Sequence, residues 1–437
     1  MIPEKIRTVL DRLCGAGYDA YLVGGCVRDM LLGRAVSDYD VTTSAQPREV
    51  EAVFRGERVI ETGVAHGTVT LILDSEPIEI TTFRTDGEYL DGRHPESVTF
   101  SRKIEDDLSR RDFTMNSIAM DRDGSVVDPF GGREDIERRI IRCTGEPDVR
   151  FGEDALRIIR ALRFSSTLGF EIEKETSDSI RRNRAFLSKI SVERVFAEFK
   201  KLLCGHDVFR ILTEYPEVVC EIIPEMAPAV GFDHKSRYHI YDVYTHIAKT
   251  VEAIEPDETL RLTMLLHDVG KPYCYTTDPD GTRHFKGHPA VSERIAREWL
   301  VRMHADGETI RLIPLLCAMH DRPIVPERRP VKRVLSKLTY EELEALCKVK
   351  CADSSAHAPD ARERAEAARN VLRVAKEVIR EGECFSLKHL AVNGHDLAAL
   401  GLRGREIGDA LSELLSLVID EKLPNEKEAL IKYISKS

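Results

Sequence analysis

The sequence predicts an α+β protein, with a mixed sheet and helices in its N-terminal part and only helices in the remainder. Residues 21–23, 67–73 and 77–83 are short apolar or alternating runs of the kind that forms strands. After the turn Asp128-Pro-Phe-Gly-Gly132, nearly every stretch has the apolar spacing of a helix. We therefore expect a sheet-containing head followed by helical domains.

The composition limits the class of protein. With 437 residues, 42% of them apolar, the chain is long enough for two or more hydrophobic cores, and no apolar run approaches the ~20 residues of a membrane span. The ten cysteines include no CxxC pair, and no cationic and apolar leader precedes Pro3, so a reducing cytoplasm is expected. The net charge of −11 disfavours a general nucleic-acid coat protein, but residues 181–201 and 322–337 are basic. Each basic run is either an RNA-binding surface or a solvated helix face.

The segment 22–33, Leu-Val-Gly-Gly-Cys-Val-Arg-Asp-Met-Leu-Leu-Gly, has two glycines where a predicted strand passes into a helix. Because glycine has no Cβ, the backbone N–H groups around Gly24 and Gly25 can close on an anion at the start of the helix. Arg28 adds the donors of a guanidinium group. The segment therefore predicts a phosphate-binding turn.

Acidic side chains follow this turn. Asp38 and Asp40 are two residues apart, a spacing that puts both carboxylates on one side of a strand. Such a pair can hold two divalent metals about 4 Å apart, the arrangement that serves phosphoryl or nucleotidyl transfer. Glu79 lies between Ile78 and Ile80, and it becomes a third carboxylate if its strand lies beside the other two; otherwise it is an exposed sheet residue.

Two further stretches of the head can contact a nucleotide. The polar segment 84–95 is typical of a loop, which can close over a bound nucleotide. In the motif that begins at Arg110, Arg111 can hold a triphosphate and Asp112 can contact a ribose hydroxyl. The alternative is an ordinary capped helix.

A helical stretch from Glu153 onward has arginine at every third position, namely Arg157, Arg160 and Arg163. This spacing makes one cationic ridge. Asp154 and Arg157 can also present a hydrogen-bonding edge to a base, with one acceptor and one donor. The alternative is a helix whose charges form salt bridges with each other.

Histidines and aspartates recur on an apolar helical background further along the chain, as His246, His267, Asp268, His288, His320 and Asp353. Such side chains from separate helices can converge on one or two transition-type divalent metals, which activate water for phosphoester hydrolysis. The alternative is a set of core histidines with satisfied hydrogen bonds. Near the end of the chain, the glycines of segment 400–408 indicate a tight turn that either offers N–H groups to a nucleic-acid phosphate or simply ends a helix.

Taken together, these motifs resemble the class II tRNA nucleotidyltransferase and bacterial poly(A) polymerase family, in the version that carries an HD domain. The resemblance covers nearly the whole chain and includes Ser191-Val-Glu-Arg194, which is similar to the neck motif of the family. It implies a polymerase-β-like nucleotidyltransferase head at 1–140, a helical neck at 141–225, a helical HD domain at 226–360 and a helical tail at 361–437.

The resemblance also implies an activity, the addition of CMP, CMP and AMP from CTP and ATP to the 3′ end of tRNA without a nucleic-acid template. It assigns Mg²⁺ to Asp38 and Asp40 with Glu79 as third carboxylate, the triphosphate to Gly25, Arg28 and Arg111, the ribose to Asp112, and the base to Asp154 and Arg157 with support from Arg160 and Arg163. It assigns a transition-type metal (Mn, Ni or Zn) to the histidines and aspartates between His246 and Asp353.

Complete CCA addition is favoured over its relatives, because segment 84–95 is whole and because an acidic chain with a full HD set is unlike most poly(A) polymerases. Partial addition (CC or A alone) and poly(A) synthesis are the alternatives within this class. Of another class is metal-dependent hydrolysis of phosphate groups on RNA ends by the HD residues. A third hypothesis treats the helical part as an RNA-docking module with vestigial HD residues.

Overall fold

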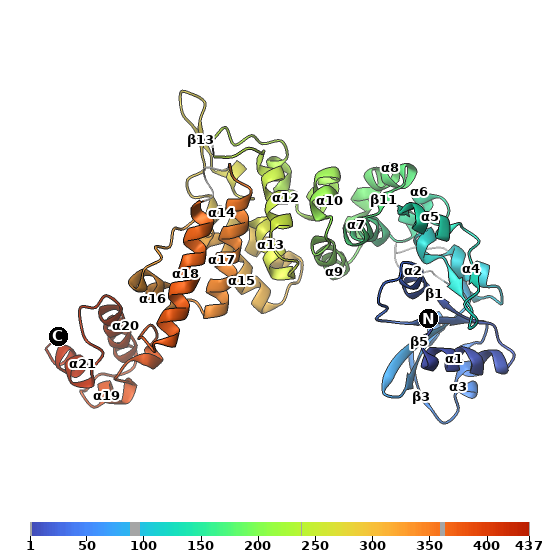
Figure 1. Cartoon of the computed structure of the whole chain (residues 1–437), viewed down its shortest axis with the longest axis horizontal. Helices are drawn as coiled ribbons and strands as arrows, with labels where there is room; N and C mark the ends of the chain where they lie inside the picture. The colour runs from blue at the N-terminus through green and yellow to red at the C-terminus, as the bar shows by residue number, and fades with distance from the viewer. Residues whose placement is uncertain (1, 88–96, 237, 359–362, 437) are drawn as a thin grey trace. The chain divides into compact units, whose positions relative to one another are not determined.

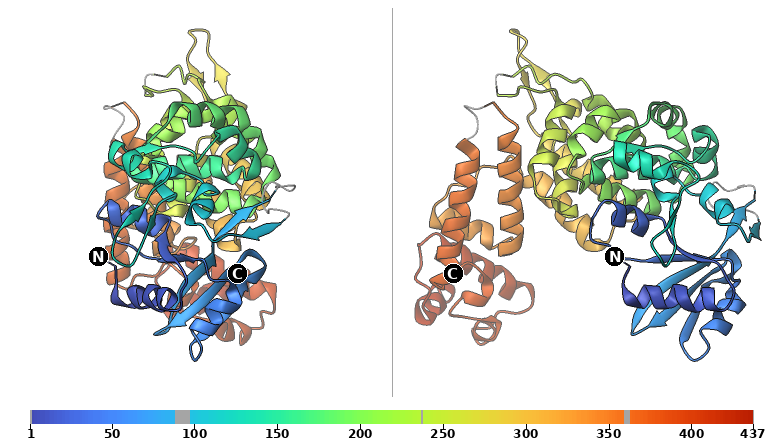
Figure 2. Two further views of the ribbon diagram at one scale, coloured as in Figure 1. Left: turned by 90° about the vertical axis from the view of Figure 1, so that its right-hand side faces the viewer. Right: turned by 45° about the vertical axis from the view of Figure 1, so that its right-hand side comes forward.

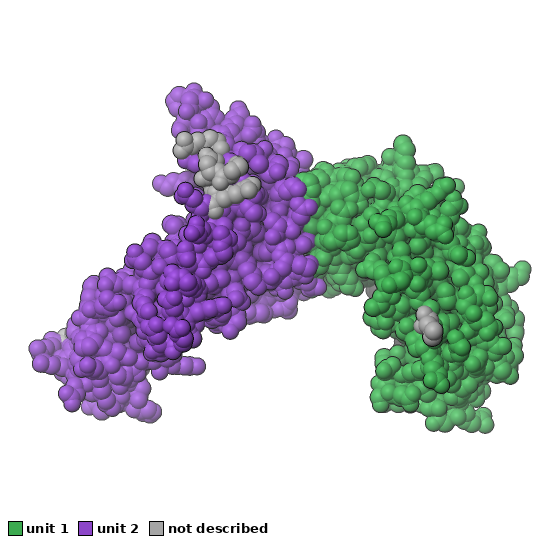
Figure 3. Space-filling model, viewed as in Figure 1, with its two compact units in different colours: residues 1–224 green, residues 225–437 purple. Residues whose placement is uncertain are grey.

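The computed structural model describes residues 2–87, 97–236, 238–358 and 363–436. The chain divides into two compact units, Met1–Pro224 and Glu225–Ser437, which are coloured separately in Figure 3. No helix in the described ranges has both the length and the apolar character needed to cross a membrane.

The first unit contains a seven-stranded sheet in the order β3-β4-β5-β2-β1-β8-β9. Neighbouring strands are antiparallel except β2 and β5, which are parallel, so the predicted mixed sheet is confirmed. The strands of this sheet are β1 (Ala20–Val23), β2 (Asp40–Thr43), β3 (Arg58–Gly63), β4 (Thr68–Leu73), β5 (Glu76–Thr82), β8 (Ala119–Met120) and β9 (Val126–Val127). Two further pairs are β6 (Arg84–Asp86) with β7 (Val98–Phe100), and β10 (Ile140–Ile141) with β11 (Glu171–Ile172).

The alternation of β5 shows how the sequence specifies this sheet. Ile78 and Ile80 are buried, whereas Glu79 between them is exposed. Because successive side chains of a strand point to opposite faces, the two isoleucines pack in the core while the glutamate emerges on the other face.

Helices of the first unit pack beside this sheet, and further helices follow it along the chain (Figure 1). The helices of the first unit are α1 (Glu4–Gly15), α2 (Gly25–Leu31), α3 (Pro47–Val53), α4 (Ile104–Ser109), α5 (Gly132–Arg138), α6 (Pro147–Glu153), α7 (Leu156–Leu168), α8 (Lys174–Asn183), α9 (Val192–Leu203), α10 (Val208–Glu214) and α11 (Pro216–Ile222). Helix α9 buries Val195, Phe199 and Leu202, which recur at helical spacing, and it packs against α7. This contact brings α9 to the functional cavity described below.

In its described residues, the second unit is helical apart from a short hairpin of β12 (Thr276–Thr277) and β13 (Arg283–His284), which projects from the bundle in both views of Figure 2. Its helices are α12 (Val243–Ala253), α13 (Glu258–Leu266), α14 (His288–Arg302), α15 (Gly307–Met319), α16 (Arg328–Leu335), α17 (Tyr340–Ser355), α18 (Glu363–Arg380), α19 (Gly394–Ala398), α20 (Arg405–Ile419) and α21 (Lys427–Ile434). The last three helices have a hydrophobic cluster of their own, centred on the fully buried Leu397, Leu414 and Leu430. The α+β prediction is therefore confirmed.

Candidate active sites

The glycine turn lies where the sequence predicts it. Strand β1 ends at Val23 and α2 begins at Gly25, and the intervening Gly24 has φ = +77°, in the region that favours glycine. A Cβ on Gly24 would also lie only 3.1 Å from Nη1 of Arg111. Glycine at this position therefore permits both the turn and the close approach of a guanidinium group.

Of the predicted acidic pair, only Asp40 lies on a strand. Strand β2 begins at Asp40, so Asp38 belongs to the segment before it, and the prediction that both share one strand is wrong. Both aspartates nevertheless line one cavity together with Gly24 and Gly25. Asp40 is in parallel register with Glu79, so the two side chains emerge on the same face of the sheet.

The electrostatics of the acidic pair suit a divalent cation. The surrounding protein reduces the hydration of Asp40 and raises its pKa, the Arg111 guanidinium opposes this increase, and the charge of Asp38 adds to it. A cation between the two carboxylates relieves their repulsion, and carboxylate oxygens are the ligands that Mg²⁺ uses in proteins. The donors present therefore fit a divalent metal.

The cavity has a volume of about 660 Å³, within the size range of small-ligand sites. Its charged lining consists of Arg28, Arg110, Arg111, Arg157, Arg160, Arg163 and Arg194 against Asp29, Asp38, Asp40, Asp112 and Asp154. Arg28 donates to both oxygens of Asp29 and, at 2.8 Å, to Oδ1 of Asn116, while Arg111 donates to Asp107 at 3.0 Å. These bonds hold the predicted triphosphate-binding guanidinium groups in place at the wall.

Asp112 is buried with both oxygens engaged. Its Oδ1 accepts hydrogen bonds from Asn116 and from the N–H of Phe113, and its Oδ2 accepts two from Arg160 at 2.9 and 2.6 Å. Burial opposes ionisation, but the charge of Arg160 and these hydrogen bonds outweigh it and lower the pKa of Asp112 to about 2. In this structure the carboxylate therefore orients Arg160 and Asn116.

The predicted base-reading pair does not lie on a single helix. Helix α6 ends at Glu153 and α7 begins at Leu156, with Asp154 in an extended conformation between them. Asp154 accepts a hydrogen bond from Arg194 at 2.9 Å, whereas Arg157 donates to Glu153 at 2.6 Å. Asp154 and Arg157 are thus held by two different side chains, Arg194 and Glu153.

The predicted arginine ridge is present on α7, and Arg157, Arg160 and Arg163 all line the cavity. The guanidinium carbon of Arg163 lies 3.9 Å from the centre of the Phe164 ring, and its Nε lies 2.8 Å from Glu198. Burial lowers the pKa of Arg163 to about 10, although Glu198 opposes the shift. The arginines of this helix therefore form ion pairs as well as lining the cavity, but with acids from other elements and not with charges of the same helix.

Sequence reasoning left four cavity-wall or supporting residues out of the predicted site: Asn116, Phe164, Arg194 and Glu198. Arg194 and Glu198 lie on α9, and a local pattern cannot show that this helix returns to Asp154, 40 positions earlier. The neck motif that contains Arg194 was the available signal.

We expect Asp112→Asn, which mimics a protonated carboxyl, to destabilise the protein at pH 7 by about 2 kcal/mol, the free energy of a pKa lowered from 3.8 to about 2. A carboxyl with a lowered pKa stabilises the fold above its unfolded pKa and loses that contribution as the pH falls toward the folded value. The difference between wild type and variant should therefore shrink between about pH 4.5 and pH 2.5. Urea unfolding at several pH values measures this, and a constant difference contradicts it.

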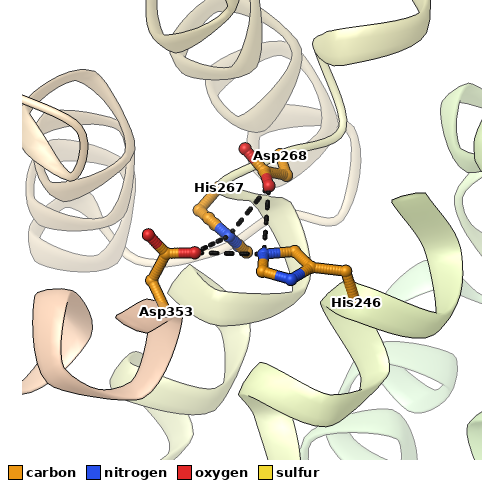
Figure 4. Close-up of side chains that lie close together, drawn as sticks. All are labelled: His246, His267, Asp268 and Asp353. Carbon is orange, nitrogen blue, oxygen red and sulfur yellow. Dashed lines mark hydrogen bonds and ion pairs between the residues drawn. The ribbon is translucent and has the colours of Figure 1, made fainter. Parts of the chain in front are cut away.

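The second candidate site lies in the second unit, where buried side chains from different helices converge. His246 lies on α12, His267 and Asp268 directly follow α13, and Asp353 lies on α17 (Figure 4). His288 opens α14 and His320 directly follows α15, and both are also buried. The structure therefore brings together all six predicted residues.

Asp268 belongs to both of the two groups of side chains that could hold a metal ion. Its Oδ2 lies 3.3 Å from Nε2 of His246 and 3.3 Å from Nε2 of His267, on the side where Asp353 also contributes an oxygen. Its Oδ1 lies 3.2 Å from Nε2 of His288 and 3.5 Å from Nε2 of His320. A carboxylate with one oxygen in each group is suited to bridge two metal ions.

The polar atoms of this site are arranged as metal ligands require. Nδ1 of His267, His288 and His320 lies 2.6, 2.8 and 2.7 Å from a backbone carbonyl oxygen, so Nδ1–H donation leaves Nε2 free toward the centre. Asp268 Oδ1 and Nε2 of His267 are buried and, among the described residues, have no hydrogen-bond partner. The donor set therefore fits a divalent metal pair better than a satisfied core.

A lysine that was not predicted lies beside this site. The Lys271 ammonium is 2.6 Å from Asp268 Oδ2 and 3.2 and 3.3 Å from Nε2 of His234 and His239. The only sequence signal was its position three residues after Asp268. The cavity outside has a volume of about 820 Å³, and its wall includes four further cations, Arg283, Lys286, Arg322 and Arg364. Asp321 and Glu363 lie in the same wall, and Asp321 pairs with Arg364 at 3.0 Å, so Arg283, Lys286 and Arg322 are the cations that could meet an anionic ligand.

The metal content of the protein tests whether Asp268 bridges two metal ions. We expect about two ions per chain in the wild type, about one in His288→Ala, and none in Asp268→Ala, because only Asp268 belongs to both ligand groups. Elemental analysis after dialysis measures the content, with His304→Ala, a histidine outside both groups, as control. Equal losses in the first two variants would contradict the bridging role.

The remaining predicted binding segments are placed as follows. Of segment 84–95, residues 88–95 lie outside the described residues, and its start forms β6. In the basic run 322–337, Arg328, Arg329, Lys332 and Arg333 form ion pairs with acids of the same unit. In the run 181–201, Arg181 pairs with Glu217 and Arg182 with Asp148. These pairs reduce the charge available to RNA. Segment 400–408 contains the turn between α19 and α20.

The arrangement of the first unit, a mixed sheet with a glycine turn and an acid pair beside an arginine-lined cavity, is that of a nucleotidyltransferase head. Family models agree: "Poly A polymerase head domain" matches residues 20–142, and "HD domain" matches residues 237–375. Between these two, "Probable RNA and SrmB- binding site of polymerase A" matches residues 169–215. At the end of the HD match, a tRNA nucleotidyltransferase domain 2 model matches residues 360–434.

Similar proteins extend this result. CCA-adding enzymes of Geobacillus thermodenitrificans and Geobacillus stearothermophilus are 54% and 53% identical over 202 and 209 residues, which are 46% and 48% of this chain. These matches cover 50% and 51% of the relatives, so the chain spans about half the length of the curated relatives it matches.

Solved structures match over the whole chain. The crystal structure of the Bacillus stearothermophilus CCA-adding enzyme in complex with CTP has a TM-score of 0.77 at 31% identity, covering 100% of this chain and 98% of that one. The Thermotoga maritima CCA-adding enzyme complexed with tRNA has a TM-score of 0.62 at 18% identity, covering 100% and 96%, and shows a similar fold. The chain belongs to the family of class II tRNA nucleotidyltransferases and poly(A) polymerases with an HD domain.

Proposed function

We propose that this protein adds CMP, CMP and AMP, from CTP and ATP, to the 3′ end of tRNA without a nucleic-acid template. The observation that carries the proposal is one cavity that holds an acid pair, a glycine turn with arginines, and the Asp154 and Arg157 side chains. The similar CCA-adding enzymes support it, and one of them was crystallised in complex with CTP.

In this proposal Asp38 and Asp40 hold Mg²⁺, with Glu79 as the third carboxylate. Bound Mg²⁺ neutralises the charge of the triphosphate and of the developing transition state. Gly25, Arg28 and Arg111 bind the triphosphate. The 3′ hydroxyl of the RNA attacks the α-phosphorus and pyrophosphate leaves. Glu79 accepts the hydroxyl proton in this proposal, which its register beside Asp40 supports.

The base is selected by hydrogen-bonding pattern. Cytosine and adenine both have an exocyclic amino group beside a ring nitrogen that lacks a hydrogen. The amino group donates a hydrogen bond to Asp154, and the ring nitrogen accepts one from Arg157. Uracil and guanine present a carbonyl oxygen in place of the amino group, so they would oppose the Asp154 carboxylate. Asp112 orients Arg160, and Arg163 supports the same wall through Glu198.

Three finer statements belong to the same proposal. The division into head, neck, HD domain and tail near residues 140, 225 and 360 is a prediction, in which the neck and tail bind tRNA mainly by its phosphates and shape. The protein works in the cytoplasm, which its ten free cysteines favour. Poly(A) synthesis and partial CC or A addition are alternatives that differ in the product.

Removal of the acid pair tests the head site. We expect Asp38→Ala and Asp40→Ala each to lower CMP incorporation into tRNA that lacks CCA by about a thousandfold or more, since metal stabilisation of the transition state is worth several kcal/mol. Incorporation of labelled CTP measures this. Asp123→Ala, at an exposed aspartate of the same unit, is the control. Activity retained in both site variants would contradict the assignment.

We also propose that the HD site hydrolyses phosphate esters on RNA ends, because six buried side chains form two ligand groups that share Asp268, beside a cavity whose wall includes several arginines and lysines. Mn, Ni or Zn fits such imidazole and carboxylate ligands. The metals, when bound, act as Lewis acids toward the phosphate. Lys271, fixed by three acceptors, supplies a charge for a phosphate oxygen.

The two activities are separable by mutation. We expect His267→Ala combined with Asp268→Ala to abolish metal-dependent hydrolysis of 2′,3′-cyclic phosphates or phosphomonoesters while CMP incorporation continues, because the ligands lie in a different unit from Asp40. Asp40→Ala should show the reverse. Hydrolysis that survives in the double variant would rule out the HD site as its source. If the metal-loaded wild type shows no hydrolysis, the HD site is vestigial.

A further inference from the structure

Arg194, from the neck helix α9, is the side chain that fixes Asp154. Nη2 of Arg194 donates to Asp154 Oδ2 at 2.9 Å, while Asp154 Oδ1 accepts the N–H of Leu156 at the start of α7, at 3.0 Å. Both carboxylate oxygens are thus engaged, and they set the plane of the group. Asp154 and Arg157 do not need each other for this, since Arg157 is held by Glu153 and by the carbonyl of Arg110.

Arg194 also faces the nucleotide cavity, with Asp154 in the same lining. Its Nη1 is buried and, within the described part of the chain, has no hydrogen-bond partner. A guanidinium group that existed only to neutralise Asp154 could use both terminal nitrogens on the carboxylate, as bidentate pairs do. In this structure Nη2 of Arg194 donates to Asp154, whereas Nη1 has no hydrogen-bond partner among the described residues.

Helix α9 repeats the arrangement one turn later, where Glu198 lies 2.8 Å from Nε of Arg163 on α7. Helix α9 therefore contributes Arg194 to the cavity wall and Glu198 as the partner of Arg163 in that wall. The contact is not explained by surface charge, because the side chain of Arg194 is only 27% exposed and that of Asp154 only 17%.

We propose that Arg194 is a specificity-determining positioning residue, which holds Asp154 as a fixed acceptor and thereby restricts the base to one with an amino group. This inference rests on the proposed nucleotidyl transfer. With Arg194 in place, the Asp154 carboxylate repels the O4 of uracil. Without it, the carboxylate can rotate away from that oxygen, and the distinction between CTP and UTP weakens.

The test compares kcat/KM for CTP, ATP and UTP in the full chain and in Arg194→Ala and Arg194→Lys, with thermal unfolding measured in parallel. We expect Arg194→Ala to lower kcat/KM for CTP and ATP by about tenfold, mainly through KM, and to narrow the preference for CTP over UTP by about tenfold, the effect of one hydrogen bond to a charged group. Arg194→Lys, which keeps one donor, should restore part of that preference. Arg122→Ala, which removes another arginine paired with an aspartate of the same unit, is the matched control.

The outcomes separate the two proposals. If the wild type incorporates CMP and AMP but both Arg194 variants keep the wild-type ratio of CTP to UTP, the positioning role is overturned and the proposed function stands. Equal losses for all three nucleotides with a lowered Tm also overturn it, since they indicate a structural role. If the wild type incorporates no nucleotide, the proposed function fails and this inference fails with it.

Discussion

The first unit depends on charge balance inside one cavity. Guanidinium groups and carboxylates from α2, α7, α9 and the segments around them are held at close range, where an unpaired charge would be costly. Two of these ion pairs each connect two parts of the chain: Asp112 holds Arg160 of α7, and Arg194 of α9 holds Asp154. Local helix and strand preferences could not determine these connections.

The acid pair Asp38 and Asp40 is the exception to this charge balance, and the proposed metal site depends on it. Asp38 and Asp40 face the same cavity, and their mutual repulsion contributes to the raised pKa of Asp40. In the second unit the same principle is stronger, because Asp268 is buried and its Oδ1 has no hydrogen-bond partner among the described residues. In both units, carboxylates that the chain leaves incompletely balanced mark the places where cations fit.

Much of the fold follows from the sequence. The alternation around Glu79 predicted β5, and the glycines at 24 and 25 marked the passage from β1 to α2, because both signals depend on neighbouring residues only. The six histidines and aspartates between His246 and Asp353 were predicted as a set, since side chains from separate helices of one bundle can meet. The error at Asp38, which precedes β2, shows that a spacing of two residues does not establish where a strand begins. The sequence did not predict the contacts of Arg194 with Asp154 and of Lys271 with Asp268, because the tertiary fold brings these side chains together.

If one cavity adds a defined sequence of nucleotides to tRNA, the sequence of the product shows it most directly. The measurement is sequencing of tRNA that ends at the discriminator base after incubation with CTP, ATP or both. We predict two added C residues with CTP alone and a terminal CCA with both nucleotides. Runs of A, a product that stops at CC when ATP is present, or no addition at all would contradict the proposed activity.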